Sequence, residues 1–181
     1  MANQTYGGNH YIAIVNEDRS VNMIAVQCEN SSGYLSALLT RFYDEEDRVR
    51  KLIAHGAIDF IYPGRYVGPS DDGETPEIFH FDSIDECINC IEPEVQEKLK
   101  RFPDEDLTCF IPHIFIYDNY KECTPNNVGW ICYSPEGMWP MDWVYYEDDE
   151  YYSSDECVED MIKDENEDAA YCKEKGLTQY L

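Results

Sequence analysis

Positive charge is scarce in this sequence. The chain has 13 lysines and arginines against 38 aspartates and glutamates, which leaves a formal charge of −25 on 181 residues. A surface of that sign repels nucleic acid and anionic lipid headgroups, so we expect no direct nucleic-acid binding and no membrane binding. The sequence also lacks an apolar run of the ~20 residues that a membrane helix needs. These two absences disfavour nucleic-acid-binding and membrane proteins as classes.

Recognised catalytic motifs are absent as well. The sequence contains no G-x-x-x-x-G-K-[ST], G-x-G-x-x-G, G-x-S-x-G or H-E-x-x-H pattern, and no EF-hand calcium loop. The four histidines are scattered, at positions 10, 55, 80 and 113. His55 precedes a glycine that should end a helix, and His113 interrupts an apolar run, so structural roles are favoured for both. We therefore predict a protein that is not an enzyme and that has no cofactor.

A leader pattern is also missing, because the first residues show no basic stretch followed by an apolar one. We expect the eight cysteines to be reduced thiols in a cytoplasm. Cys87 and Cys90 form the one C-x-x-C pair, and a zinc site would need further ligands at suitable spacing. His80 lies seven residues before Cys87, but no fourth ligand is evident. We favour the interpretation that the two cysteines are core residues of a helix, and we predict no metal site.

Hydrophobic periodicity and turn residues predict an α+β fold. We expect an antiparallel or mixed sheet of four to six strands, with the helices packed on one face. Pro112 suggests an edge position or a bulge for its strand. The expected strands are His10–Val15, Val21–Cys28, Cys109–Tyr117, Val128–Tyr133 and Trp139–Tyr146. The expected helices are Tyr34–Tyr43, Asp44–Gly56, a short helix capped by Ser83, Pro93–Phe102, and a last one that Ser153 or Ser154 caps and Gly176 ends.

Acidic residues are concentrated in the second part of the chain. Residues 1–66 carry eight acids and six bases, a net charge of −2, whereas residues 67–181 carry 30 acids and seven bases, a net charge of −23. We expect these two parts, a near-neutral one of a hairpin and helices and an acidic one, to form a single compact domain. Such asymmetry favours interaction with a basic partner over catalysis.

The strongest signal is the segment from Asp142 to Asp168. Of its 27 residues 13 are acidic, and Lys163 is the one base. Repulsion along a helix costs a few tenths of a kcal/mol per pair, which a cationic partner would relieve. A surface that only keeps the protein soluble is the competing interpretation. The predicted partner-binding residues are Asp142, Tyr145, Tyr146, Glu147, Asp148, Asp149, Glu150, Tyr151, Tyr152, Asp155, Glu156, Glu159, Asp160, Asp164, Glu165, Glu167 and Asp168.

Residues 11–62 follow a pattern of a strand hairpin, a leucine-rich helix ending in Tyr, acidic residues and a second helix ending in Gly. The residues of this pattern are Tyr11–Asn16, Cys28, Gly33, Tyr34, Ala37–Leu39, Tyr43, Asp44, Val49, Leu52, Ile53, Gly56 and Ile58. They resemble the N-terminal part of a family of small phage and prophage proteins. In that family the hairpin ends in a Cys-His-Trp-Asp-Gly-Tyr-like segment, and this sequence departs from it at Glu29–Ser32, where the Trp and the Asp are missing. The resemblance implies phage origin and no particular activity.

Phage origin and a phosphate-like surface together predict an inhibitor of a host DNA-targeting defence system, restriction or CRISPR. The acidic part resembles phage DNA-mimic inhibitors in charge character. In this hypothesis the chain works in the host cytoplasm and fills the basic groove of a nucleic-acid-binding protein, and a homodimer would lengthen the duplex-like surface. One alternative is an acidic module that regulates a host protein outside its DNA groove. A lower-ranked alternative is a small enzyme acting on a defence signalling nucleotide.

Overall fold

The computed structural model describes residues 10–27, 32–68, 77–101, 112–120, 127–134, 137–142 and 154–176. It has the α+β class that the sequence predicts. The helices are α1 (Ser32–Phe42), α2 (Glu46–His55), α3 (Ile84–Arg101) and α4 (Asp155–Lys175). The strands are β1 (His10–Val15), β2 (Val21–Val26), β3 (Phe60–Ile61), β4 (Tyr66–Val67), β5 (Phe79–Phe81), β6 (Ile114–Tyr117), β7 (Asn127–Ser134) and β8 (Gly137–Asp142).

Six strands form one mixed sheet in the order β5-β2-β1-β6-β7-β8, and β3 and β4 form a separate hairpin. The β1–β6 pair is parallel, and the other neighbouring pairs are antiparallel. Strands β1 and β2, from the near-neutral part of the chain, lie between β5 and β6 from the acidic part. The change in charge along the sequence therefore does not separate two sheets.

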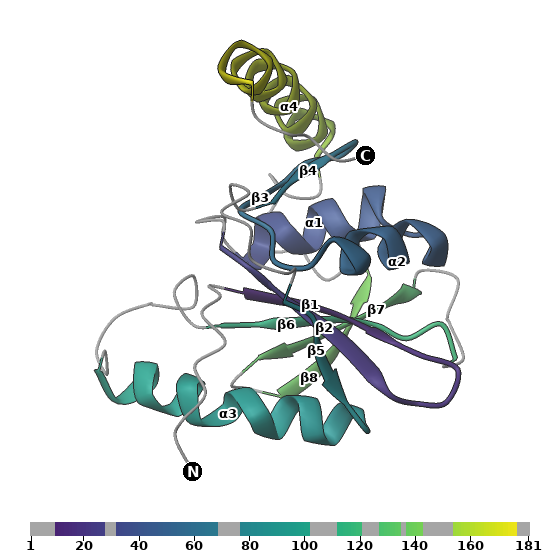
Figure 1. Cartoon of the computed structure of the whole chain (residues 1–181). Helices are drawn as coiled ribbons and strands as arrows, with labels where there is room; N and C mark the ends of the chain where they lie inside the picture. Colours follow the sequence, from purple (N-terminus) through teal and green to yellow (C-terminus); the bar gives the residue numbers. More distant parts are fainter. Residues whose placement is uncertain are drawn as a thin grey trace.

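Helices cover both faces of the main sheet, which corrects the expectation that they pack on one face (Figure 1). On one face Ile12, Ile14 and Ile24 join the apolar residues of α1 and α2 in a single core. On the other face Tyr11 and Met23 belong to a second core with residues of α3. Because successive side chains of a strand point to opposite faces, the unbroken apolar runs of β1 and β2 require a cover on each side.

Helix α3 runs without interruption from Ile84 to Arg101, with Pro93 inside it. The sequence predicts two helices here, one before Pro93 and one beginning at it. Proline removes one helical hydrogen bond, but the buried residues Cys87, Ile91 and Val95 keep a spacing of four across it. Burial of this continuous stripe outweighs the lost hydrogen bond, so the two expected segments form one helix.

Strand β6 lies in the interior of the sheet, between β1 and β7. The expectation that Pro112 marks an edge position or a bulge is wrong, because the strand begins only at Ile114. At the entry to the strand, the carbonyl of His113 accepts a hydrogen bond from Tyr11 N at 2.9 Å. Pro112 therefore precedes the ladder and is not required to donate to it.

The short β3–β4 hairpin is fixed to the main core through Tyr43, which follows α1. The Tyr43 hydroxyl donates to the carbonyl of Tyr62 at 2.8 Å. The Tyr43 carbonyl in turn accepts from the indole Nε1 of Trp130 in β7 at 2.8 Å. Burial raises the pKa of Tyr43 far above its ordinary value, so the hydroxyl remains a donor. The main sheet thereby fixes the position of the hairpin against which α4 lies.

Candidate functional site

Helix α4 carries most of the described part of the acidic segment. It spans Asp155–Lys175, and nine of its 21 residues are acidic. Ser154 caps its start by accepting a hydrogen bond from Cys157 N at 3.2 Å, and Gly176 ends it in the left-handed conformation with a φ of 69°. The predicted end at Gly176 is confirmed, and Ser154 is the cap of the two residues, Ser153 and Ser154, that the sequence offers. Strong capping holds the helix together despite the repulsion between its carboxylates.

One stripe of α4 faces the rest of the protein. Cys157 and Met161 are fully buried in the core that α1 and α2 share with the sheet. Cys172, near the other end of the helix, packs with Tyr62 of the β3–β4 hairpin. In Figure 1, α4 lies beyond the α1–α2 layer and beside the hairpin. Among the described residues, the opposite side of the helix is exposed to solvent.

Glu165 lies in the buried stripe and is the polar anchor of α4. Its Oε1 accepts from Arg65 Nε at 3.0 Å, and both its carboxylate oxygens lie 3.1 Å from Gly64 N. A Cβ atom at Gly64 would lie only 2.7 Å from Oε1, so glycine allows this close approach. Glu165 is 8% exposed and serves the chain's own structure, contrary to the predicted partner-facing role. Asp168 also has an internal partner, the Tyr62 hydroxyl, which donates to Oδ2.

The remaining predicted residues on α4 are exposed. With successive residues about 100° apart, they fall within an arc of about 180° on the side away from the buried stripe. Asp142 is the last residue of β8, and only its backbone is described. Tyr145, Tyr146, Glu147, Asp148, Asp149, Glu150, Tyr151 and Tyr152 lie outside the described residues. The exposed set, named here the α4 acidic face, is Asp155, Glu156, Glu159, Asp160, Asp164 and Glu167.

We expect Glu165→Ala to loosen α4 from the hairpin. The change removes hydrogen bonds to a charged group, each of which contributes about 1.5–3 kcal/mol. Amide hydrogen exchange in α4 should therefore accelerate by about tenfold to a hundredfold, while exchange in β1 and β6 stays unchanged. Glu159→Ala is the control, because Glu159 is exposed on the same helix. Equal exchange rates in the two variants would refute the anchoring role of Glu165.

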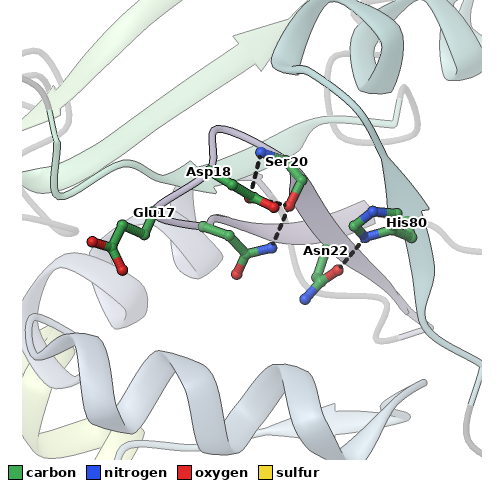
Figure 2. A pocket seen from close by; sticks show the side chains of 6 residues that line it. Glu17, Asp18, Ser20, Asn22 and His80 are labelled. Carbon is green, nitrogen blue, oxygen red and sulfur yellow. Dashed lines mark hydrogen bonds between the residues drawn. The ribbon is translucent and has the colours of Figure 1, made fainter.

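A second polar site lies at the β1–β2 turn, in an open pocket of about 610 Å³ (Figure 2). Its side chains form two hydrogen-bonded groups, one of Asn16, Ser20 and Asp18 and one of His80 and Asn22. Asn16 Nδ2 donates to Ser20 Oγ at 3.0 Å, and Ser20 Oγ donates to Asp18 Oδ1 at 2.6 Å. His80, from β5, lies 2.8 Å from Asn22 Oδ1 through its Nδ1. Because an amide oxygen only accepts, His80 Nδ1 carries the proton of this bond.

The chemistry of this pocket does not favour anionic substrates. Hydrogen bonds from the Ser20 side chain and backbone hold the pKa of Asp18 below its ordinary value, so the carboxylate stays charged. Glu17 adds a second carboxylate at the same rim. Ser20 is buried, and its hydroxyl is engaged by Asp18 and Asn16, which argues against a nucleophilic role. Two carboxylates beside one imidazole would repel the phosphates of a signalling nucleotide.

The surroundings of Cys87 and of His113 agree with the structural roles that the sequence predicts for them. Cys87 contacts the sulfur of Met23 at 3.6 Å, and burial raises the pKa of the Cys87 thiol to about 12. In the ranges that the structure covers, no three His, Cys, Asp or Glu side chains are placed to hold a metal ion. The His113 ring stacks on Phe115 with centroids 6.3 Å apart, and its backbone N donates to His10 Nδ1 at 3.3 Å.

Comparisons with known proteins add no assignment. No family model, curated protein or solved structure matches this sequence. Within the described ranges, no helix combines the length and the hydropathy needed to cross a lipid bilayer. The charge pattern and the geometry of α4 are therefore the basis for an interpretation of function.

Proposed function

We propose that this chain is a phage-encoded, non-enzymatic inhibitor of a host DNA-targeting defence system, and that it acts as an acidic mimic of nucleic acid. The observation that carries the proposal is the α4 acidic face, a row of exposed carboxylates on a capped and anchored helix. Carboxylates offer arginine and lysine the same kind of charge-assisted hydrogen bonds as phosphate oxygens. A host groove built to hold a nucleic-acid backbone would bind this face.

The density of charge on α4 supports mimicry of one nucleic-acid strand. Asp155 and Glu167, the ends of the acidic face, are 12 residues apart, which corresponds to about 18 Å of helix. A single strand of B-DNA places about five phosphates over the same length, since each strand carries one phosphate per ~3.4 Å of helix axis. The face presents six carboxylates. Other carboxylates of the segment from Asp142 to Asp168 would have to imitate the phosphates of the second strand.

Binding is expected to depend on salt and to exclude DNA. The test begins with affinity purification of the partner from a bacterial host that expresses the tagged chain. Affinity for the purified partner should fall by at least ~10-fold between 50 and 200 mM salt, and labelled duplex DNA should be released as the chain is added. A complex that persists in molar sodium chloride would overturn the proposal. A partner that retains its DNA would instead favour the regulator that binds outside the DNA groove.

A further inference from the structure

A half-open pocket lies between the β3–β4 hairpin and α4, with aromatic and acidic side chains in its lining. Its volume is about 220 Å³, below the ~300 Å³ at which small-molecule sites begin, so it suits one side chain. Tyr34 of α1, Phe60 of β3 and Tyr62 line it on the aromatic side. The lining from α4 consists of Asp164, Glu167 and Asp168.

The aromatic side of the pocket includes an exposed ring, that of Phe60. Phe60 is 53% exposed, although its neighbour in β3, Ile61, is 1% exposed and lies in the main core. A half-exposed phenylalanine is commonplace on its own, but this one lines a pocket together with three carboxylates. An aromatic face next to carboxylates is an arrangement that binds a planar cation.

The three carboxylates of the pocket differ in the hydrogen bonds and ion pairs that they make within the chain. Asp168 accepts from the Tyr62 hydroxyl, and Glu167 is in loose contact with Lys163 Nζ at 4.0 Å. Asp164 is exposed, and among the described residues it has no hydrogen bond or ion pair. The Lys163–Glu167 pair is solvated on both sides and worth little, so an incoming cation can replace it at small cost.

We propose that this pocket binds the arginine side chain of a basic partner protein, an inference that rests on the proposed function and names the group recognised. The guanidinium plane stacks on Phe60, and its N–H groups donate to Asp164 and Glu167. The chain already contains one such pair, since Arg48 Cζ lies 4.7 Å from the centroid of the Tyr43 ring. Lysine fits less well, because its ammonium is more strongly hydrated and cannot stack as a plane.

The test compares peptides of nine arginines and nine lysines, which carry equal charge. Their dissociation constants are measured by fluorescence anisotropy at 150 mM salt. The wild-type chain should bind the arginine peptide about fivefold to tenfold more tightly than the lysine peptide. Phe60→Leu keeps an apolar side chain but removes the ring, so it should reduce that ratio by about threefold or more and leave lysine-peptide affinity unchanged.

Two further variants each remove one charge, one inside the pocket and, as its matched control, one outside it. Asp164→Asn should lower the arginine preference, whereas Glu159→Gln should weaken both peptides equally. Circular dichroism checks that each variant is folded. The proposal is overturned by equal wild-type affinities, or by an arginine preference that survives both Phe60→Leu and Asp164→Asn.

The outcomes separate this inference from the proposed function. An arginine preference that depends on Phe60, in a chain that releases no DNA from its partner, supports the pocket and refutes the mimic. Salt-dependent release of DNA without any arginine preference supports the mimic and refutes the arginine pocket.

Discussion

Arg19→Met is expected to lower the free energy of unfolding by about 3 kcal/mol, because it leaves a buried carboxylate without its cation. Arg19, in the β1–β2 turn, donates from Nη1 and Nη2 to the two oxygens of Asp118 at 3.2 and 3.3 Å. The Asp118 side chain is fully buried, while that of Arg19 is 50% exposed, so the lower end of the usual range applies. Urea denaturation of the two chains measures the difference.

The backbone at Arg19 provides a control. Its φ is 71°, a left-handed conformation that costs a non-glycine residue roughly 1–2 kcal/mol. Arg19→Gly loses the same ion pair but relieves this strain, so it should be less destabilising than Arg19→Met by about 1 kcal/mol. In the double variant Arg19→Met/Asp118→Asn the buried charge is gone, and part of the stability should return. Strictly additive effects would show that the pair contributes nothing.

The second prediction with a large expected effect concerns the affinity of the chain for its partner protein. Neutralising three carboxylates of the α4 acidic face with Glu156→Gln, Glu159→Gln and Asp164→Asn should weaken partner binding by about a hundredfold or more. We base this on roughly 1 kcal/mol or more for each charge-assisted contact that is lost. Inhibition of the purified partner's DNA binding, measured at fixed salt, is the readout.

Helix α3 supplies the matched set, because it lies on the opposite face of the main sheet (Figure 1). Asp85→Asn, Glu92→Gln and Glu97→Gln change the net charge by the same amount, and all three residues are exposed. This variant should inhibit nearly as well as the wild-type chain. Equal losses in the two triple variants would mean that overall charge, and not the α4 acidic face, drives binding.

Local signals in the sequence identified most elements, while their arrangement in space was not derivable. Strand His10–Val15 and the capped helix between Ser154 and Gly176 were predicted within a residue or two, because alternation, capping and glycine act locally. The order of the strands depends on long-range pairing, such as Tyr11 with Ile114. The unbroken apolar run of β1 already indicated a cover on each face of the sheet, but which helix covers which face could not be assigned before that order was known.

The candidate site was predicted in part. Charge density indicated α4, but it did not distinguish exposed carboxylates from Glu165. A signal for that distinction was present, since Glu165 falls four residues after Met161 and seven before Cys172, on the stripe that is buried. The aromatic side of the pocket could not be foreseen, because only the folded hairpin brings Phe60 to the pocket that Asp164 also lines.

The parallel pairing of β1 with β6 has a consequence for synthesis on the ribosome. Residue 11 must wait for its neighbour at residue 114, so more than half of the polypeptide has to emerge before the centre of the sheet can close. Contacts this distant in sequence slow folding, and until they form, one backbone edge of β1 remains open to other chains. The acidic residues that precede β6 in the sequence emerge before it, so their negative charge would discourage nascent copies from associating and gives them a protective role before any target is met.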